Sequence, residues 1–481
     1  MRETGGSVDL AQLPPDDPAV YRSLQEADTI GVFQVESRAQ MATLPRVRPE
    51  RFYDLVVQVA IIRPGPIVGD MVHPYIRRRR GREPVTYPHP SLEPILRRTL
   101  GVPLFQEQLL KMAMVTAGFS ATEAEELRRA FGFKRSERLM AEVEMKLRAG
   151  MARQGIHGAA AEEIVHAITA FALYGFPESH ASSFALLAYA SAYLRVHHPA
   201  AFYAALLNNQ PMGFYHPATI VKDAQRHGLR ILPIDVTCSQ WLCTVEPIDG
   251  TRAVMRMGLR YVKGLRERVG RAIVEAREAR VFGSIHDLAR RAHLDRDELE
   301  TLAAIGALAP LGGTRRTNLW TAAKPHPGPL FADPPPEESP LSEMTDIERL
   351  AADYAGTSVT LGRHPMTLRR AALRRRGVLS ARELGGVEDG ARIEVAGSVI
   401  VRQRPGTAKG FVFLSLEDET GISNVIVTPP VFARHRLALV SEPYLVVDGI
   451  AQRQDGVLSV RAIGVRALPA LGHHVPSHDF G

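Results

Sequence analysis

A cluster of cationic side chains near the end of a predicted helix is the strongest chemical signal in the sequence. Ser120 and Glu123 have the spacing of a capping box, which predicts that a helix begins there. The cluster that follows consists of Arg128, Arg129, Lys134 and Arg135. Guanidinium groups bind phosphate through paired hydrogen bonds, and an ammonium group adds a point charge. The cluster therefore fits a polyphosphate, and the alternative is a solvated basic surface.

The excess positive charge of the chain lies in one stretch. The 481 residues include 59 Lys and Arg against 52 Asp and Glu, a formal net charge of +7. Residues 46–135 hold 16 Lys and Arg against 9 Asp and Glu, which equals the whole excess. The stretch includes the run Arg77–Arg80 and Arg82 as well as the cluster. Local positive charge of this kind favours a polyanionic partner.

Several strings in order make the sequence resemble a known family. They are T-I-G-V-F-Q-V-E-S at Thr29–Ser37, I-R-P-G-P at Ile62–Pro66, L-F-Q-E-Q at Leu104–Gln108 and Y-G-F-P-E-S-H-A-S-S-F-A at Tyr174–Ala185. Together they resemble the fingers region of the C-family of bacterial DNA polymerases, which are related to the alpha subunit of DNA polymerase III. Further strings resemble the error-prone, damage-inducible branch: G-F-K-R-S at Gly132–Ser136, F-P-E-S-H at Phe176–His180, N-N-Q-P-M-G-F-Y at Asn208–Tyr215 and L-G-R-H-P-M at Leu361–Met366.

The resemblance implies a nucleotide site in the fingers. The residues it assigns to nucleotide or phosphate binding are Arg63, Arg128, Arg129, Lys134, Arg135 and His180. His180 lies at the start of a predicted helix, where free N–H groups favour anions, and the alternative for this residue is a structural role. Replicative relatives usually carry a lysine where this chain has Glu178, so we do not expect a phosphate contact there.

The acidic motif of the family's palm domain does not occur in this sequence. That motif is typically P-D-x-D-x-D-F, and its carboxylates hold two metal ions for phosphoryl transfer. The resemblance therefore implies the C-terminal portion of a polymerase, with the palm upstream of Met1. We expect Mg²⁺ to be bound by ligands outside this chain, no catalytic or metal-binding residue within it, and no catalysis by this chain alone.

A second DNA-binding unit is predicted after the fingers. Residues Met257–Arg277 resemble a helix-hairpin-helix motif whose hairpin turns on Gly264. Backbone N–H groups of such a hairpin face a DNA phosphate and position DNA without reading its sequence, and Lys263 adds a cation. A weaker copy spans Leu294–Leu308, with Gly306 in its turn. The alternative for both copies is an ordinary helical hairpin.

A β-rich region ends the chain. Alternating apolar residues predict five strands, at residues 391–404, 410–418, 422–428, 444–454 and 457–468, with a helical piece at 431–439. Five strands with that insertion predict an OB-fold, a barrel that commonly binds single-stranded nucleic acid. Arg402, Arg404 and Lys409 flank the first turn, and Phe411 begins the second strand. These residues are candidates for DNA contacts, although a phenylalanine here also suits core packing.

These patterns predict a multidomain α+β protein, in which a mostly α-helical fingers and helix-hairpin-helix region precedes a C-terminal five-stranded OB-fold β-barrel. The expected domains are a segment leading from palm to fingers (1–45), the fingers (46–210), the helix-hairpin-helix region (211–320), a proline-rich linker (321–345), a helical connector (346–388), the OB-fold domain (389–470) and a tail (471–481).

The expected function is that of an error-prone, DNA-directed DNA polymerase in damage-induced translesion synthesis. Its partners would be primer–template DNA, single-stranded DNA and dNTPs, with other mutagenesis proteins and, indirectly, the sliding clamp. The sequence has no apolar signal region, no run of ~20 apolar residues and only two cysteines, which predicts a cytoplasmic protein without membrane contact. The alternative is a non-catalytic DNA-binding accessory protein. An OB-bearing tRNA synthetase is disfavoured because its nucleotide-binding signatures are missing.

Overall fold

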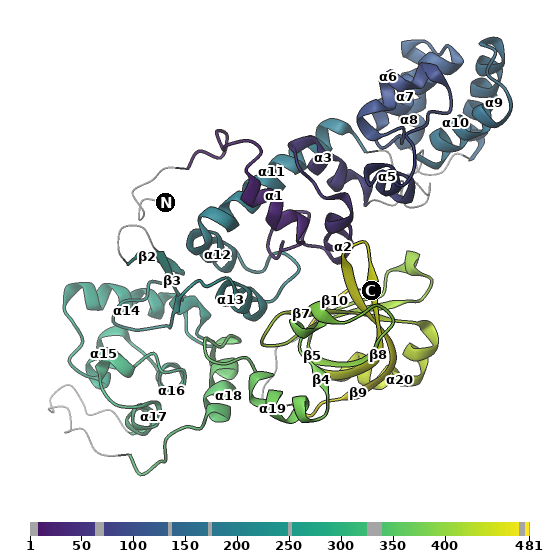
Figure 1. Ribbon diagram of the computed structural model, residues 1–481. Helices are drawn as coiled ribbons and strands as arrows, with labels where there is room; N and C mark the ends of the chain where they lie inside the picture. The colour runs from purple at the N-terminus through teal and green to yellow at the C-terminus, as the bar shows by residue number, and fades with distance from the viewer. Residues whose placement is uncertain are drawn as a thin grey trace. The chain divides into compact units, whose positions relative to one another are not determined.

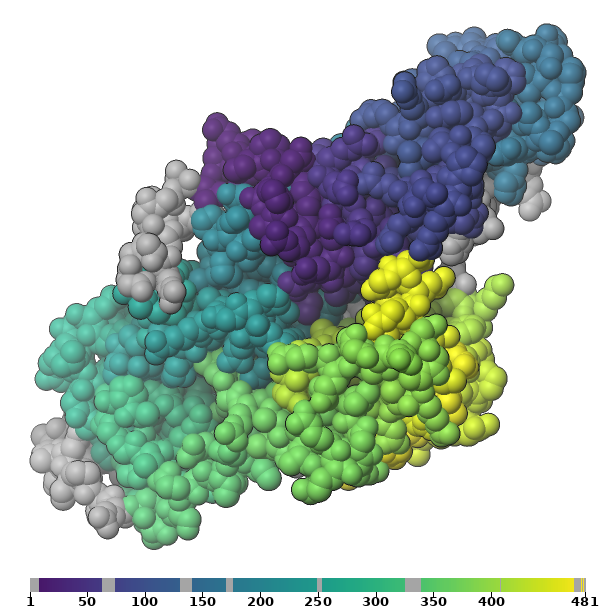
Figure 2. Space-filling model, in the orientation of Figure 1, coloured from purple at the N-terminus to yellow at the C-terminus, as the bar shows by residue number. Residues whose placement is uncertain are grey.

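The computed structural model describes residues 8–62, 72–132, 137–171, 176–248, 253–324, 339–470 and 477–480, which carry colour in Figure 2. Contacts divide the chain into two units, and each is described by itself. The N-terminal unit is Asp9–Val196 with Asp455–Val457. The C-terminal unit is His197–Gln454 with Met1–Val8 and Leu458–Gly481.

The described part of the N-terminal unit is built from helices (Figure 1). They are α1 (Pro18–Gln25), α2 (Arg38–Val47), α3 (Phe52–Ile61), α5 (Val72–Arg79), α6 (Glu93–Leu96), α7 (Gln106–Ala117), α8 (Ala121–Gly132), α9 (Glu137–Arg153), α10 (Gly158–Phe171) and α11 (Glu178–His197), with the 3₁₀ turns η2 (Pro90–Leu92) and η3 (Arg97–Thr99). Side-chain caps set several starts: Asp17 accepts from two amides of α1, and Ser37 caps α2.

One hydrophobic core joins these helices. In α3 every residue from Asp54 to Ile61 is buried, so most of this helix lies inside the unit. Val20, Leu24 and Leu44 from α1 and α2 belong to the same core. The first 45 residues, which the sequence analysis separates from the fingers, therefore pack with them where they are described. In α11 the small residues Ala181, Ala185, Ala188 and Ala192 are buried, which allows close approach of neighbouring helices.

The C-terminal unit begins with helices and a small sheet. α12 (Pro199–Asn208) and α13 (Pro217–Arg226) precede the strands β1 (Ile231–Leu232), β2 (Thr244–Pro247) and β3 (Ala253–Arg256), which are ordered β1-β3-β2. The turn η4 (Leu259–Tyr261) leads to the helices α14 (Glu267–Ala279), α15 (Ile285–Ala292), α16 (Arg296–Ala304) and α17 (Arg315–Ala323), with η5 (Ala309–Leu311) between the last two. Residues 325–338 of the predicted linker lie outside the described residues.

The predicted barrel is present, and every strand lies where the alternation placed it. Its elements are β5 (Arg392–Gln403), β6 (Val412–Glu417), β7 (Ile422–Val427), α20 (Pro429–Ser441), β8 (Tyr444–Gln454) and β9 (Val457–Ala467), with η7 (Gly406–Ala408) in the first loop. β5 pairs antiparallel with both β6 and β8, β7 pairs with β6, and β9 joins β7 in parallel and neighbours β8. This closed order, with a helix between the third and fourth strands, is that of an OB-fold.

A further strand, β10 (His478–Phe480), lies in the segment that the sequence analysis assigns to a tail. It pairs in parallel with residues Val401–Gln403 of β5. The remainder of that tail, residues 471–476 and Gly481, lies outside the described residues.

The predicted connector packs against the barrel. It contains α18 (Asp346–Thr357), α19 (Thr367–Arg375), β4 (Val378–Leu379) and η6 (Glu383–Gly386). β4 pairs in parallel with β5, and Met366, Leu373 and Val378 share a core with Tyr444 and Val446 of the barrel. α19 and β4 are thus part of the barrel's outer layer, whereas Leu350 and Tyr354 of α18 pack against Ala218 of α13.

A buried carboxylate joins the barrel to α13. Glu417, at the end of β6, accepts from Arg226 Nη2 at 2.8 Å and from Thr219 Oγ1 at 3.3 Å, and His364 Nε2 lies 3.9 Å away. Burial by itself raises the pKa of a carboxyl group, but the charges of Arg226 and His364 hold the pKa of Glu417 below its usual value. Glu417 is therefore ionised and its charge is compensated.

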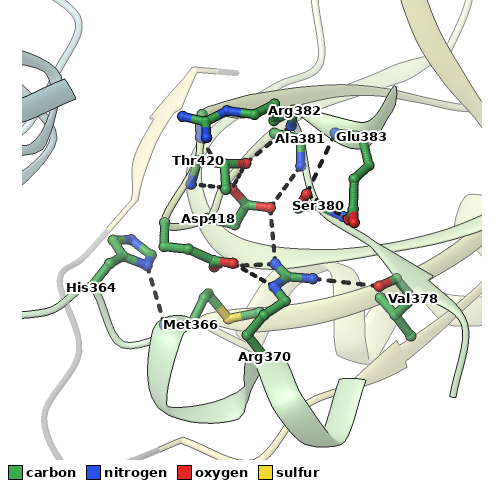
Figure 3. Close-up of polar contacts among 12 residues, drawn as sticks. His364, Met366, Arg370, Val378, Ser380, Ala381, Arg382, Glu383, Asp418 and Thr420 are labelled. Atoms are coloured by element: carbon green, nitrogen blue, oxygen red, sulfur yellow. Dashed lines mark hydrogen bonds and ion pairs between the residues drawn. The ribbon is translucent and has the colours of Figure 1, made fainter. Parts of the chain in front are cut away.

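The neighbouring carboxylate holds α19 (Figure 3). Asp418 accepts from Arg370 Nη2 at 3.0 Å and from the amide of Ala381 at 2.7 Å. Its other oxygen accepts from the amide of Thr420 at 2.7 Å, which closes the turn between β6 and β7. Arg370 also pairs with Glu419 and donates to the carbonyl of Val378. These contacts fix the connector on the turn.

None of the helices in the described part of the chain is both long enough and apolar enough to span a membrane.

We predict that Glu417→Ala locally destabilises the C-terminal unit by about 3 kcal/mol, because Arg226 would remain buried without its anion. Hydrogen–deuterium exchange of the β6 and β7 amides in the full chain measures this. Asp448→Ala is the matched control, because it removes the partner of Arg392, whose side chain is 71% exposed, and such pairs contribute under about 1 kcal/mol. Equal exchange in the two variants would contradict the prediction.

A second prediction concerns Lys222 of α13. Its Nζ donates to the carbonyl of Gly362 at 2.6 Å and to Gln225 at 2.9 Å, and burial lowers its pKa to about 8. An unfolded lysine has a pKa of about 10.4, so between pH 8 and 10.4 the unfolded state binds more protons. Stability should therefore rise with pH across this window, by up to about 3 kcal/mol.

The variant Lys222→Met removes this titration. Thermal melts at pH 8 and pH 10 should show a wild-type chain that gains stability relative to the variant as the pH rises. Melting curves that shift in parallel for both proteins would mean that Lys222 titrates normally.

Candidate nucleic-acid interface

The helix that carries the cationic cluster forms as predicted. The Ser120 hydroxyl accepts from the amide of Glu123 at 3.3 Å, and the Glu123 carboxylate accepts from the amide of Ser120 at 2.9 Å. Leu127 is fully buried, which leaves Arg128 and Arg129 on the exposed side of α8. The structure therefore presents both guanidinium groups to solvent.

The two arginines share one carboxylate unequally. Arg128 donates to both oxygens of Glu125, at 2.8 and 2.7 Å, whereas Arg129 Nε lies 3.4 Å from Glu125 and its side chain is 71% exposed. Hydrogen bonds from Arg128 lower the pKa of Glu125 to about 2. Arg128 is thus already neutralised in a bidentate pair, and Arg129 is the more available cation. Arg63, Lys134 and Arg135 lie outside the described residues.

His180 lies in the first turn of α11 among aromatic rings. Its ring centroid is 5.1 Å from that of Phe176 and 4.2 Å from that of Phe184, and Phe33 packs edge-on against Phe184 at 5.3 Å. His180 remains exposed. An exposed imidazole held by rings at a helix start is compatible with an anion or a base.

The carboxylate of Glu178, two residues before His180, has a structural role. Glu178 accepts from the Tyr53 hydroxyl at 2.9 Å and from Arg98 at 3.3 Å, and Arg98 stacks 3.8 Å from the centre of the Tyr53 ring. Burial, together with the hydrogen bond to Glu178, raises the pKa of Tyr53. Glu107 accepts from the Glu178 amide at 2.9 Å, so it caps α11. Neither Glu125 nor Glu178 fits a Mg²⁺ ligand, because arginine already engages both.

The arginine run at the end of α5 contributes less positive surface than its sequence indicates. Arg79 pairs with buried Asp54 at 2.6 Å, and Arg80 donates to the carbonyl of Arg46 at 2.7 Å. Arg77 and Arg78 share Glu83. The run therefore holds the helices of the N-terminal unit together.

The helix-hairpin-helix turn forms around Gly264, but Lys263 is engaged within the chain. Gly264 has a φ of +80°, and a Cβ added there would meet no atom within 4 Å, so glycine is required by the backbone conformation and not by crowding. The Lys263 amide donates to the carbonyl of Gly356 at 2.7 Å, and its Nζ donates to the carbonyl of Tyr354 at 3.0 Å. Lys263 thus caps the end of α18 in this structure.

The two hairpins are joined by an ion pair between Arg266, whose side chain is 40% exposed, and a buried carboxylate, a contact that no local sequence pattern indicates. Glu298 is 3% exposed and accepts from the Arg266 side chain at 2.8 and 2.7 Å and from its amide at 3.0 Å. Glu298 also completes a capping box with Asp295 at the start of α16. That capping box was visible in the sequence, but its partner 32 residues away was not. The second hairpin turns at Gly306, as expected, with a φ of +84°.

The first loop of the barrel carries three of the predicted DNA contacts. Arg404 and Lys409 are exposed, and Arg404 lies 5.0 Å from the ring centre of Phe432 on α20. Phe411 is partly buried and precedes β6. The loop between β5 and β6 therefore offers two accessible cations, Arg404 and Lys409, and the partly buried ring of Phe411.

The sequence predicts that Arg402 contacts DNA, but in this structure its side chain is engaged by groups of the same chain. Its Nε donates to the carbonyl of Leu439 at 2.8 Å, and Nη2 donates to the carbonyl of Glu442 at 2.6 Å. Nη1 donates to the Ser477 hydroxyl and lies 3.5 Å from Asp479. Arg402 therefore caps the end of α20 and holds β10, because β5 directs its side chain toward these groups.

Comparison with known proteins gives two family matches. Residues 1–155 match the model of the bacterial DNA polymerase III alpha subunit finger domain. Residues 228–318 match the model of the helix-hairpin-helix motif. The first match overlaps residues 46–155 of the predicted fingers, and the second lies within the predicted helix-hairpin-helix region.

Similar curated proteins are named error-prone DNA polymerase. The protein from Anaeromyxobacter dehalogenans (strain 2CP-C) is 52% identical over 470 residues, covering 95% of this chain and 42% of that protein. Those from Methylococcus capsulatus and Pseudomonas paraeruginosa are 49% and 48% identical and cover 95% and 99% of this chain, and 46% and 47% of their own lengths. The chain thus spans less than half the length of the curated relatives it matches.

One solved structure, asparaginyl-tRNA synthetase from Pyrococcus horikoshii, aligns with 18% of this chain and 21% of that one at 26% identity. The TM-score of this alignment is 0.15, which is too low to indicate a shared fold.

We predict that Arg129→Ala weakens binding of inorganic triphosphate about two- to fivefold, the effect of an exposed charge pair of about 0.5–1 kcal/mol. Arg128→Ala should weaken it less, because Glu125 already occupies that guanidinium group. Isothermal titration calorimetry of the full chain measures both, with Arg97→Ala as an exposed control in the same unit. Equal effects of Arg97→Ala and Arg129→Ala would mean that the cluster is a solvated basic surface and not a specific phosphate site.

Proposed function

We propose that the chain is part of a C-family bacterial DNA polymerase of the error-prone branch, and that it is the part of such an enzyme that holds nucleotide and DNA. The observation that carries this proposal is the alignment of 95% of the chain, at about half identity, with proteins named error-prone DNA polymerase. The matched finger and helix-hairpin-helix models and the OB-fold barrel support it, since these elements follow one another along the same chain.

The proposed nucleotide site lies in the N-terminal unit. Arg129, with Arg128, would bind the triphosphate of an incoming dNTP through charge-assisted hydrogen bonds. Arg63, Lys134 and Arg135 are proposed to add charge, and His180 is proposed to contact the nucleotide from the start of α11. Mg²⁺ would be bound by carboxylates outside this chain and would stabilise charge during nucleotidyl transfer. We propose no catalytic residue in this chain.

DNA would be held by contacts to its backbone. The open turn at Gly264 is the proposed duplex contact of the helix-hairpin-helix region, where it approaches a phosphate without a side chain in the way. Arg404, Lys409 and Phe411 would bind single-stranded DNA at the barrel, since an OB-fold combines a basic groove with base stacking. None of these contacts reads base edges, so binding should be independent of sequence.

The wider setting is part of the same proposal. A polymerase of this branch would act on damaged primer–template DNA in the cytoplasm, with other mutagenesis proteins and, indirectly, the sliding clamp as partners. The alternative is a non-catalytic DNA-binding accessory protein. Binding of dNTPs separates the two, because an accessory protein has no use for a triphosphate site.

We predict that the full chain binds oligonucleotides independently of sequence and with a strong salt dependence. Each neutralised phosphate releases condensed counterion, so the log–log slope of affinity against salt should be roughly −0.7 to −0.9 per contact. Fluorescence anisotropy with labelled single-stranded and duplex DNA of several sequences, from low to high salt, measures this.

The barrel's contribution is isolated by a double variant. Arg404→Ala with Lys409→Ala should lower single-strand affinity more than duplex affinity, because the barrel needs unpaired bases. The matched control is Arg434→Ala with Arg436→Ala, which removes two exposed arginines from α20 of the same domain. Equal losses on both substrates, or the same loss in the control, would mean that the first loop is not a single-strand site.

A further inference from the structure

The edge of strand β5 changes partner halfway along its length. β8 covers residues Arg392–Ser398, and the register with β6 shifts between Val399 and Val401. Beyond this bulge, β10 takes the place of β8 and pairs with residues Val401–Gln403. A strand edge left open in this way accepts another extended segment through main-chain hydrogen bonds. Here a segment of the same chain occupies it.

The charge of Arg402 is compensated from that segment. Two of its donors reach the carbonyls of Leu439 and Glu442, which fix the guanidinium group but carry no net charge. Asp479 is its carboxylate partner among the described residues, at 3.5 Å. The Arg402 side chain is 14% exposed, whereas that of Asp479 is 53% exposed. A fixed, largely buried cation thus meets a loosely held, accessible anion.

The contact is weak enough to be exchanged. A long ion pair to an exposed carboxylate contributes little, on the order of 0–1 kcal/mol. Three residues of strand pairing are also short by the measure of stable strands. The guanidinium group of Arg402 is therefore held on one side by two backbone carbonyls. On the other side, Nη1 donates to the Ser477 hydroxyl and makes the long contact to Asp479, so both of these partners belong to residues 477–480 and leave together with β10.

Arg402 is adjacent to the loop proposed to bind single-stranded DNA. β5 ends at Gln403, and Arg404 and Lys409 follow in the loop. A phosphate of DNA on this loop would favour the same Nη1 donor, because guanidinium binds phosphate and carboxylate oxygens with the same geometry. The Asp479 carboxylate would repel that phosphate as long as β10 stays paired.

We propose that residues 477–480 compete with single-stranded DNA for Arg402, with the Asp479 carboxylate in the position of a DNA phosphate and β10 on the edge of β5. This inference rests on the proposed single-strand binding by the barrel and adds an internal competitor to it. Release of β10 exposes Arg402 and lets it join Arg404 and Lys409. In the state in which β10 has been released from β5, Arg402 is then free to bind DNA, as the sequence predicts.

A substitution that removes the negative charge of Asp479 tests the competition. Asp479→Asn in the full chain should raise affinity for an oligo(dT) probe about two- to fivefold, the equivalent of an exposed pair of about 0.5–1 kcal/mol. Asp448→Asn removes the same charge from the same barrel, where it pairs with Arg392 at the other end of β5, and should leave affinity unchanged. Equal gains in both variants would show general electrostatics and would overturn the proposal.

Hydrogen–deuterium exchange of the unmodified chain provides a second readout. Saturating oligo(dT) should accelerate exchange of the amides of residues 477–480, because their strand pairing is lost. Unchanged protection of these amides with DNA bound would overturn the competition. Absence of oligo(dT) binding in the wild type and in both variants would instead contradict the proposed function, and this inference with it.

Discussion

The C-terminal unit depends on one buried carboxylate. Glu417 ends a barrel strand, yet its partners come from α13 and from the segment before α19, so a single charge joins three parts of the chain. An ionised group at 3% exposure is tolerated only when its desolvation is offset by opposite charge and hydrogen bonds. Asp418, the next residue, does the same for Arg370. The turn after β6 is therefore the point on which the barrel, the connector and α13 are assembled.

Arginine in this protein often serves the fold where composition indicates a ligand. Arg79, Arg266 and Arg402 bind buried carboxylates or backbone carbonyls, because guanidinium offers five donors in a fixed plane and can satisfy several acceptors at once. The net charge of +7 remains, but it is distributed over fewer accessible groups than a count of basic residues implies. Arg129, Arg404 and Lys409 are among the cations that stay exposed.

The accessible groups suit contacts with a phosphate backbone. Exposed arginines, an open glycine turn and a loop with both basic and aromatic residues offer positive charge and stacking. A polymerase must move along every sequence, so this kind of surface agrees with the function proposed for the chain. Arg402 is a further cation near this loop, and in the proposed competition its contact with Asp479 keeps it from DNA until β10 is released.

Local patterns in the sequence determined the elements of this protein. The barrel strands, the insertion at α20, the capping box at Ser120 and the turns at Gly264 and Gly306 follow from alternation, cap chemistry and backbone freedom, which act over a few residues. The family strings located the fingers and the helix-hairpin-helix region, as the matched family models confirm. The tertiary structure alone decided which charges are available. Glu298 and Arg266, Glu417 and Arg226, and Arg402 and Asp479 are 32 to 191 residues apart, and no local pattern pairs residues at such separations.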